Sequence, residues 1–588
     1  MDRHRLLALS FALAALCSAV AGSRQLKQTS TNTSTTMVVP YGTITGTAIV
    51  VARDFLAKRS DKILALRVPS GRSMHIENVD PDTLETIQSG QQIQVTGEIV
   101  QEADVLDPTD PGDAVGTADG TVGGAADTPP CNNGNGKGNG NGNCKKRWRL
   151  KRVRAQKINK LGGKKKAPVE TIQEGDDDMG QYFGNGDPSA LPAGDRRRRL
   201  QAIKFGAVSP VYISTLPVNY PDLKTIIIPI AGFNTSANQA CTGTTMPTVT
   251  RFQLRQTMFA ELQPNEPTVG SYAKQCSLGK TLLNETTSYV APIVRLPCSG
   301  NSWGIPWSMS TCEFDDFSGY ADAADDVLTA RGIDLTKYKF RVYLLPPGPC
   351  TFVGLGFVGC DDNFPCRAWI GSNFWTTPQA IAHEMGHNMG MGHAGAYDNN
   401  GNFDEYLDDT CVMGYCCTDR CPNAPHMWQL GWSQAVLLNG TNLPAGTTLN
   451  MTLGTPSFYY RSTIRIKPTW VTGVQQFFLS FRTKTNGDTD LGDPYGNKVH
   501  IHQAPTSGSY DSSLTTWRWS LVQGQGYSHP TSQLVIRRAA SNMGGIAVVT
   551  ICRKANNGQE NATSCANNWD YNCDGRAGDD DPTCALYR

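Results

Sequence analysis

Three histidines and a glutamate lie close together in the 588-residue chain, in the run HEMGHNMGMGH that starts at His383. Side chains four positions apart lie one above the other on a helix, so His383 and His387 can present two imidazoles to one point. Two imidazoles form half of a tetrahedral zinc site. Gly390 and Gly392 can adopt positive φ, end the helix and turn His393 back toward the metal. We therefore predict a zinc site made of His383, His387 and His393.

Glu384 is the acid next to this predicted site. Three protein ligands leave a fourth position open for water, which a catalytic zinc needs and a structural zinc does not. The Glu384 carboxylate can accept a proton from that water during attack on a peptide carbonyl and pass it to the leaving nitrogen. The alternative is a short motif that arose by chance. The chain has only nine histidines, and three of them stand at the required spacing around this acid, which favours a hydrolase.

Periodicity predicts the elements that must hold these residues. Thr376 or Thr377 can cap a helix over residues 376–391, with Pro378 in the first turn, where its missing N–H costs nothing. Buried strands are predicted at 224–231, 338–345, 354–359 and 367–374, and a further helix at 316–331. The pattern indicates a mixed α/β (α+β) zinc peptidase domain over residues 200–438. An edge strand within 354–374 is expected to align an extended substrate.

A methionine that follows the histidines in the chain is a further part of the pattern. Met413 lies in the segment CVMGY, twenty residues after His393. A long histidine motif followed by such a methionine resembles the metzincin metallopeptidases. The resemblance implies that Met413 lies in a tight turn beneath the zinc ligands. It also implies that Tyr415 matches the tyrosine that, in some metzincins, approaches the metal or stabilises the oxyanion.

Several segments are also similar to gametolysin-type peptidases, secreted lysins of green algal cell walls. They are GLGFVGCDDNFPCRAWI at 354–370, the histidine helix, CVMGY, and NAPHMWQLGW at 423–432. The resemblance covers about residues 200–502. It implies a zinc endopeptidase that degrades extracellular-matrix or cell-wall glycoproteins rich in proline or hydroxyproline. Some relatives have glutamine in place of the first histidine, so His383 favours zinc here.

The first 199 residues look like segments removed from the active protein. Residues 1–21 have the basic start, apolar run and small-residue cleavage site of a secretory signal peptide. Residues 41–102 alternate apolar and polar positions, which predicts a small β domain. Residues 103–199 lose this periodicity, which predicts a flexible linker with basic runs. The arginines from Arg196 to Arg199 suit a processing protease, so we predict a propeptide over 22–199.

Residues 439–588 lack helical periodicity and predict a separate C-terminal β-sandwich-like domain with a Cys/Asp-rich tail.

The remaining composition indicates an exported chain. The 53 basic and 52 acidic residues balance, which gives no reason to expect nucleic acid or an anionic membrane as partner. No stretch after the signal approaches the roughly 20 apolar residues of a membrane anchor. We expect a secreted, disulfide-bonded glycoprotein. Its sequons are at Asn32, Asn234, Asn284, Asn439, Asn450 and Asn561.

Latency of such an enzyme can come from a thiolate in the open metal position. Cys131 follows two prolines, as in the cysteine switch of matrix metalloproteases, but Asn132 stands where that motif has glycine. The alternative is a disulfide between Cys131 and Cys144 that closes the intervening loop.

Fifteen cysteines follow Arg199, an odd number, so at least one should be free or paired between chains. Cys360 with Cys366, and the cluster Cys411, Cys416, Cys417 and Cys421, are expected to staple loops around the active site. Near the C-terminus, Asp570, Asn572 and Asp574 alternate before a glycine, as at the start of a calcium loop. A disulfide-tied acidic turn between Cys565 and Cys584 is the alternative.

Two further predictions concern the remaining histidines and an alternative function. His500 and His502 alternate on a predicted strand; such a pair can bind a metal, but we expect both to face solvent. His426 can donate to a substrate or to the methionine turn, or it can be a packed structural residue. The alternative function is a catalytically silent matrix-binding glycoprotein that retains a peptidase scaffold, with the β domain doing the recognition.

Overall fold

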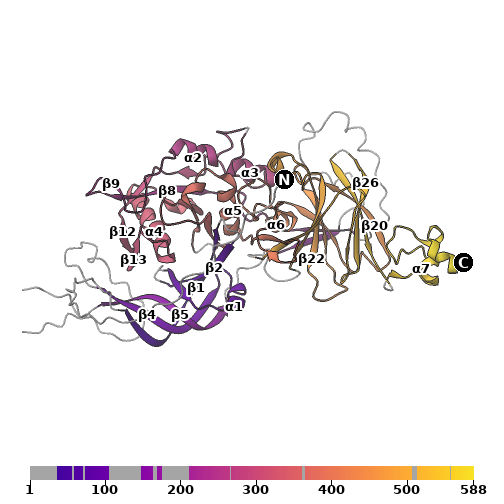
Figure 1. Cartoon of the computed structure of the whole chain (residues 1–588), viewed down its shortest axis with the longest axis horizontal. Helices are drawn as coiled ribbons and strands as arrows, with labels where there is room; N and C mark the ends of the chain where they lie inside the picture. Colours follow the sequence, from indigo (N-terminus) through magenta and orange to yellow (C-terminus); the bar gives the residue numbers. More distant parts are fainter. Residues whose placement is uncertain are drawn as a thin grey trace, which may run out of the picture.

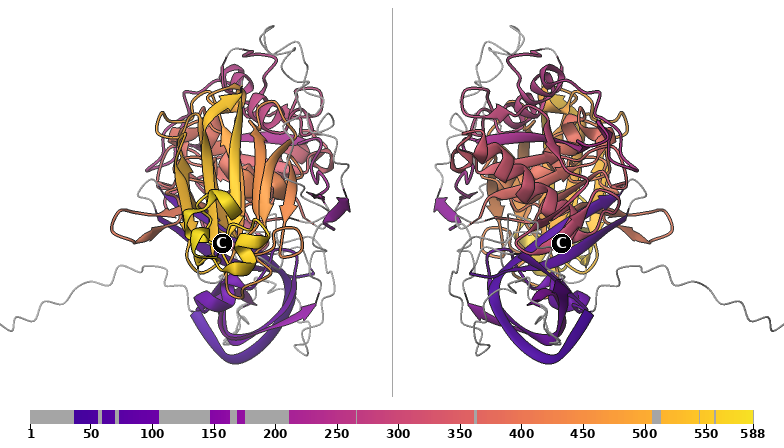
Figure 2. Two further views of the ribbon diagram at one scale, coloured as in Figure 1. Left: turned by 90° about the vertical axis from the view of Figure 1, so that its right-hand side faces the viewer. Right: turned by 90° about the vertical axis from the view of Figure 1, so that its left-hand side faces the viewer.

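The computed structural model describes residues 36–55, 59–69, 73–104, 147–162, 169–174, 211–264, 266–360, 364–505, 513–543, 545–555 and 558–587. Its ribbon has an N-terminal β part in indigo, a central mixed α/β part in magenta and orange, and a C-terminal β part in orange and yellow (Figure 1). The N-terminal part lies below the other two in both side views (Figure 2). None of the described helices has the length and apolar character needed to cross a membrane.

The central part is built on four buried strands in the order β8-β14-β16-β15. They are β8 (Thr225–Asn234), β14 (Phe340–Leu344), β16 (Cys366–Ile370) and β15 (Gly354–Phe357). The first three are parallel, and β15 is antiparallel to β16. Their runs of apolar residues are buried on both faces, as parallel strands require. The four predicted strands are therefore confirmed, with small shifts at their ends.

Short strands extend this framework. The strands β9 (Gln239–Ala240), β10 (Tyr289–Val290) and β11 (Val294–Leu296) pair with β8, and β12 (Ser299–Ser302) forms a hairpin with β13 (Ile305–Ser308).

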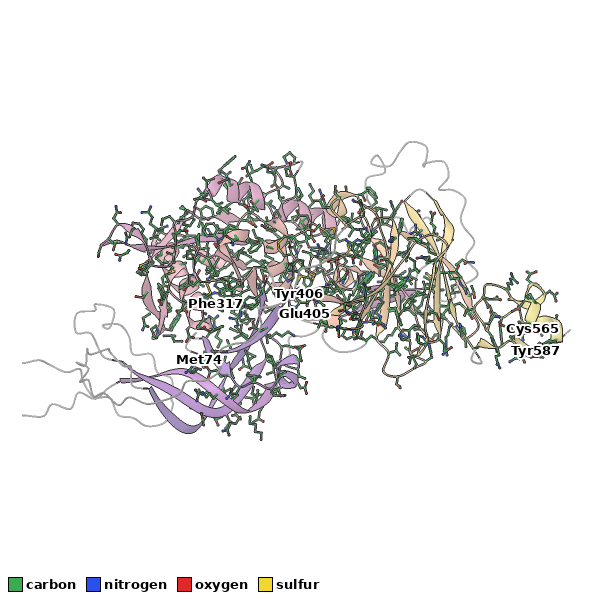
Figure 3. The ribbon with its side chains drawn as sticks, viewed as in Figure 1. Met74, Phe317, Glu405, Tyr406, Cys565 and Tyr587 are labelled. Carbon is green, nitrogen blue, oxygen red and sulfur yellow. A yellow bond between two sulfur atoms is a disulfide. The ribbon has the colours of Figure 1, made fainter. Side chains whose placement is uncertain are left out.

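Two helices pack on the sheet where the sequence predicted them. They are α4 (Phe314–Ala330), which contacts β8 and β11, and α5 (Pro378–Asn388), which contacts β15 and β16. Between α4 and the sheet, Phe317 packs edge-on against Trp369 and lies inside the core (Figure 3). The other helices of the described residues are α1 (Pro81–Glu85), α2 (Arg251–Met258), α3 (Val269–Cys276), α6 (Ala424–Gln429), α7 (Ala562–Ala566) and the 3-10 turns Leu335–Lys337, Ser372–Phe374, Asn486–Asp488, Gly578–Asp580 and Pro582–Tyr587.

The N-terminal part has four strands where the sequence predicted a small β domain, and a fifth strand beyond it. The first four are β1 (Thr36–Phe55), β2 (Arg59–Arg67), β3 (Ser73–Glu77) and β4 (Gln92–Asp104). The prediction of a flexible linker throughout 103–199 is wrong for β6 (Thr171–Glu174), which pairs with β7 (Tyr212–Thr215). It is also wrong for β5 (Arg147–Gly162), which pairs with β4 and β3. Its basic run hides a two-residue period, because Val153 and Ala155 point into the core around Met74 (Figure 3) while Arg152 and Arg154 pair with Glu77.

The β1 strand joins this domain to the central part. It pairs antiparallel with β15 as well as with β2 and β4, so the two parts share one twelve-stranded sheet. Ile49 and Val51 of β1 are buried in the same apolar cluster as Leu355 of β15. The N-terminal domain is therefore packed onto the rest of the protein.

The C-terminal part has the two packed sheets of a β-sandwich, as predicted. A nine-stranded sheet has the order β18-β17-β24-β23-β22-β21-β19-β7-β6, and a four-stranded sheet has the order β20-β27-β26-β25. Their apolar faces meet in one buried cluster. The larger sheet also takes in β6, β7, β17, β18 and β19, which all precede residue 439. The predicted domain boundary at residue 438 stays a prediction.

The strands of the sandwich have the following bounds. They are β6 (Thr171–Glu174), β7 (Tyr212–Thr215), β17 (Ala394–Tyr397), β18 (Phe403–Asp404), β19 (Gln434–Leu438), β20 (Thr448–Gly454), β21 (Arg461–Ile466), β22 (Gln476–Arg482), β23 (Lys498–Ala504), β24 (Thr515–Leu521), β25 (Gly526–His529), β26 (Leu534–Met543) and β27 (Ile546–Arg553).

Disulfides link the loops of the described chain. They join Cys241 to Cys298, Cys276 to Cys421, Cys312 to Cys350, Cys360 to Cys366, Cys416 to Cys417, Cys552 to Cys573 and Cys565 to Cys584. Cys411 is the free cysteine among the described residues and is buried. The odd count after Arg199 thus leaves one thiol, as predicted.

Candidate active site

The α5 helix presents the first two histidines of the site. His383 and His387 lie one turn apart on it, and their ring centroids are 4.9 Å apart. The helix ends at Asn388, and Gly390 has the positive φ, 93°, that turns the chain back. Gly392 does not have a positive φ, so Gly390 alone makes the predicted turn. His393 then lies with its ring centroid 4.8 Å from that of His387.

Each histidine has its Nδ1 atom held by an acceptor. Nδ1 of His383 lies 2.9 Å from the Val412 carbonyl oxygen, and Nδ1 of His387 lies 3.0 Å from the Met391 carbonyl oxygen. Nδ1 of His393 lies 2.9 Å from Glu405 Oε2. Carbonyl and carboxylate oxygens only accept, so Nδ1 carries the proton in each ring. In the neutral rings, each Nε2 therefore points a lone pair at the centre of the site.

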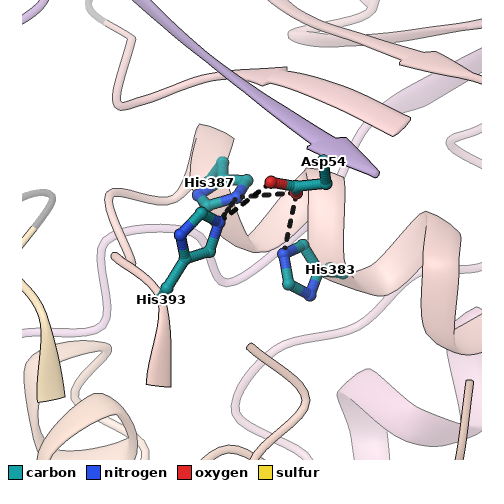
Figure 4. Close-up of side chains that lie close together, drawn as sticks. All are labelled: Asp54, His383, His387 and His393. Atoms are coloured by element: carbon teal, nitrogen blue, oxygen red, sulfur yellow. Dashed lines mark hydrogen bonds and ion pairs between the residues drawn. The ribbon is translucent and has the colours of Figure 1, made fainter. Parts of the chain in front are cut away.

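A fourth group joins the three Nε2 atoms: Asp54, at the end of β1 (Figure 4). Its Oδ2 lies 3.0 Å from Nε2 of His383 and 3.3 Å from Nε2 of His387, and its Oδ1 lies 3.1 Å from Nε2 of His393. All four side chains are buried. The sequence analysis missed Asp54, because nothing near it in the chain marks it as part of this site.

The arrangement fits a metal ion in both distance and donor chemistry. Tetrahedral zinc with ligands at about 2.0–2.1 Å separates neighbouring ligand atoms by about 3.3 Å, close to the separations between Asp54 and the rings. Lone pairs and carboxylate oxygens that converge without a cation repel each other, and Nε2 of His383 has no hydrogen-bond partner. The three histidines thus form a buried metal site, as predicted.

The protonation of the histidine rings and the charge of the nearby carboxylates also favour a cation at the site. Burial lowers the pKa of His387 to about 4, so that ring is neutral at pH 7. Burial opposes a charge on His393 too, but Asp54 and Glu405 raise the pKa of His393 to about 9. The carboxylates at the centre therefore require a positive charge, which either a proton on His393 or a bound metal ion supplies.

Comparison with known proteins agrees with this geometry. Residues 235–523 match the family described as Gametolysin peptidase M11. This part of the chain belongs to that family. A relative named autolysin, from Chlamydomonas reinhardtii, is 26% identical over 489 residues, which cover 66% of this chain and 73% of the relative. Residues 235–523 therefore carry an M11 metallopeptidase domain with a buried histidine metal site, and the predicted resemblance is confirmed.

Glu384 of the M11 domain has no room to move away from the metal site. It is fully buried, and neither of its carboxylate oxygens has a hydrogen-bond partner that satisfies normal geometry. A Cβ atom at Gly354 would lie 2.2 Å from Glu384 Oε1, so β15 passes directly against this carboxylate. Burial, together with the charge of Asp54, raises the pKa of Glu384 well above its usual value.

The loop after His393 lies against the M11 site from the other side. Met413 is fully buried, and its sulfur would lie 2.6 Å from a Cβ atom at Gly386 of α5. Tyr415 lines the same pocket as His383 and Glu384. Tyr406, which the sequence analysis did not single out, also lines this pocket, and its hydroxyl donates a hydrogen bond to Asp54 Oδ1. Its ring lies 4.4 Å from that of His393, and it is labelled beside Glu405 in Figure 3.

The histidines outside the triad are structural in their surroundings. The prediction that His500 and His502 face solvent is wrong, because both are fully buried. His502 Nε2 lies 3.1 Å from Asp408 Oδ2, and His500 Nε2 lies 2.9 Å from the Tyr495 carbonyl oxygen. The side chain of His426 is also buried, and its Nδ1 lies 3.4 Å from the Cys411 sulfur.

Three predicted features lie outside the described residues: the signal peptide at 1–21, Cys131 with Cys144, and the arginines from Arg196 to Arg199. The proposed calcium residues are described. Oxygens of Asp570 accept hydrogen bonds from the backbone N–H groups of Asp574 and Gly575, and Asn572 Oδ1 accepts one from Asp574. These contacts and the Cys565–Cys584 disulfide match the alternative of a tied acidic turn.

Proposed function

We propose that this M11 metallopeptidase is a secreted zinc endopeptidase that degrades extracellular-matrix or cell-wall glycoproteins. The observation that carries the proposal is the convergence of three Nε2 lone pairs beside a buried, unpartnered Glu384 carboxylate. Three nitrogen ligands with one further position are the ligand set of a hydrolytic zinc. A bound zinc ion supplies Lewis acidity, which polarises a carbonyl and makes water nucleophilic near neutral pH.

The residues of the chain then handle the substrate and the proton. Glu384 takes the proton from the attacking water and gives it to the leaving nitrogen, for which a raised carboxyl pKa is suited. Tyr415 lines the pocket and donates to the oxygen that becomes negative. The substrate backbone pairs with β15, whose residues border both the metal site and Glu384. Met413 supports the helix beneath the histidines.

The proposed substrate class is based on the names of the similar proteins. The matching family is described as Gametolysin peptidase M11, and the similar Chlamydomonas protein is named autolysin. We propose proline- or hydroxyproline-rich glycoproteins of a wall or matrix as substrates. Seven disulfides among the described residues suit an oxidising, extracellular location. Production as a zymogen, with processing at Arg196 to Arg199, belongs to the same proposal.

Hydrolysis of a proline-rich wall glycoprotein by the processed chain tests this function. Cleavage should stop when a chelator removes the metal and return when zinc is added back. Glu384→Gln should lower kcat by about 10²- to 10⁴-fold while zinc content stays at one ion per chain. The exposed Glu261→Gln in the same domain serves as the matched control and should keep full activity. If processed protein binds the glycoprotein but shows no chelator-sensitive cleavage, the silent matrix-binding alternative holds instead.

A further inference from the structure

The end of β1 occupies the strand position that a substrate needs. Residues Val51, Ala52, Arg53 and Asp54 pair antiparallel with Phe357, Gly356, Leu355 and Gly354 of β15. The other side of β15 pairs with β16. Both edges of β15 are therefore used, and an extended peptide cannot add to it while β1 stays in place.

Asp54 occupies the chemical centre as well. Its two carboxylate oxygens lie 3.0–3.3 Å from the three Nε2 atoms, and only 5% of the residue is exposed. Burying an aspartate at the end of a strand is costly unless cations or donors compensate it. The hydroxyl of Tyr406 is one such donor. The Nε2 atoms of the neutral rings supply no donor, so the carboxylate needs either a proton on His393 or a metal ion, and a metal ion also satisfies the convergent lone pairs of His383 and His387.

The contacts around Asp54 hold it in one place. The backbone N–H of Val353 donates to the Asp54 carbonyl at 2.8 Å, and the N–H of Val358 donates to the Val50 carbonyl at 2.8 Å. Next to Asp54, Arg53 Nε donates to Asp61 Oδ1 of β2 at 2.8 Å. Apolar residues of β1 and β2 are buried in the core of the M11 domain. A folded domain thus holds the Asp54 carboxylate at the metal site, which lowers the entropic cost of placing it beside the histidines.

We propose that Asp54 is the fourth ligand of the metal in the full-length chain and keeps the peptidase latent, so that activation requires β1 to leave β15. This rests on the function proposed above. Withdrawal of β1 frees the fourth position for water, uncovers Glu384 and exposes the edge of β15 together. Because the site has one such position, the predicted thiolate of Cys131 is not needed for latency.

The test compares uncleaved full-length proteins that carry Asp54→Ala, Asp54→Asn or the matched control Glu98→Gln, a carboxylate of the same β domain paired with Arg154. Three readouts are used: the visible spectrum of the cobalt-substituted protein, binding of a peptide hydroxamate, and peptide cleavage. We expect both Asp54 variants to keep one metal per chain, change the cobalt spectrum and bind the hydroxamate. Because loss of the carboxylate also weakens the attachment of β1, β1 should leave β15 more often, and the cleavage rate of both variants should rise at least about tenfold above that of the wild-type precursor. Glu98→Gln and Cys131→Ser should behave as wild type.

Two outcomes overturn the inference. One is an Asp54 variant with an unchanged cobalt spectrum and no hydroxamate binding, and the other is a Cys131→Ser precursor that becomes active. If the Asp54 variants do not fold, the wild-type protein is compared before and after processing. The inference then requires that its cobalt spectrum and its hydroxamate binding change when the N-terminal domain is removed. A processed wild type that binds hydroxamate but cleaves nothing refutes the proposed function and leaves the ligand assignment of Asp54 standing.

Discussion

Asp54 and His387 are 333 positions apart in the chain, yet the Oδ2 atom of the first lies 3.3 Å from the Nε2 atom of the second. The contact brings the end of an N-terminal β domain into the centre of a metallopeptidase site. It exists because β1 continues the sheet of the M11 domain along β15. One strand pairing therefore places a carboxylate at the metal position and covers the edge of β15 that we propose for the substrate.

The two tyrosines of the pocket should have opposite effects when altered. Tyr406→Phe removes the hydrogen bond to Asp54, which should loosen the latent state. A hydrogen bond to a charged group contributes about 1.5–3 kcal/mol, so basal cleavage by the precursor should rise by about tenfold or more. Tyr415→Phe should leave precursor latency unchanged but lower kcat of the processed enzyme by about 10²-fold.

Each tyrosine variant is the control for the other. Cleavage rates of the same peptide are measured before and after processing for both. Equal losses in the processed enzyme with no change in either precursor would contradict the separate roles.

The metal ligands could be predicted from sequence because their geometry is local. The spacing of His383 and His387 matches the pitch of one helix, and Gly390 indicates the turn that brings His393 back toward them. Asp54 could not be found in this way. Its neighbours in the chain show only an alternating strand, and its role depends on which distant edge that strand pairs with.

Two other misses have the same kind of cause. In β5 the basic side chains dominate the composition, and the alternation of Val153 and Ala155 became visible only with β4 beside it. His500 and His502 alternate as in a strand with one solvent-facing side, but both are covered in the fold. The loop that carries Asp408 and Thr410 covers His502, and Tyr495 and Ser520 contact His500. Local pattern gives the element, and burial depends on what packs against it.

Arg482 should be an ionic residue on which the segment around the methionine turn depends. It is fully buried at the end of β22, pairs with Asp488, and donates to the carbonyl oxygens of Thr410 at 3.0 Å and Cys421 at 3.2 Å. Arg482→Met leaves Asp488 buried without its cation, which should lower the free energy of unfolding by about 3–5 kcal/mol. Urea unfolding of the full-length protein measures this loss.

Lys484→Met is the matched control for Arg482, since Lys484 pairs with Asp493 on the surface. Exposed pairs contribute about 0–1 kcal/mol, so this variant should unfold at nearly the wild-type urea concentration. Similar losses in both variants would show that the buried pair has no special role.

His426 should make the protein less stable in mild acid. Burial lowers the pKa of His426 to about 3, whereas an unfolded histidine has a pKa of about 6.5. Below pH 6.5 the unfolded chain takes up a proton that the folded chain refuses, so this group's contribution to stability falls as pH drops toward 3. The slope is about 1.4 kcal/mol per pH unit. His426→Leu, which keeps an apolar side chain of similar size, should remove that slope. Unfolding free energies of wild type and variant are measured between pH 5 and 7. Parallel curves for the two proteins would mean that His426 is already charged in the fold, or that it titrates normally there.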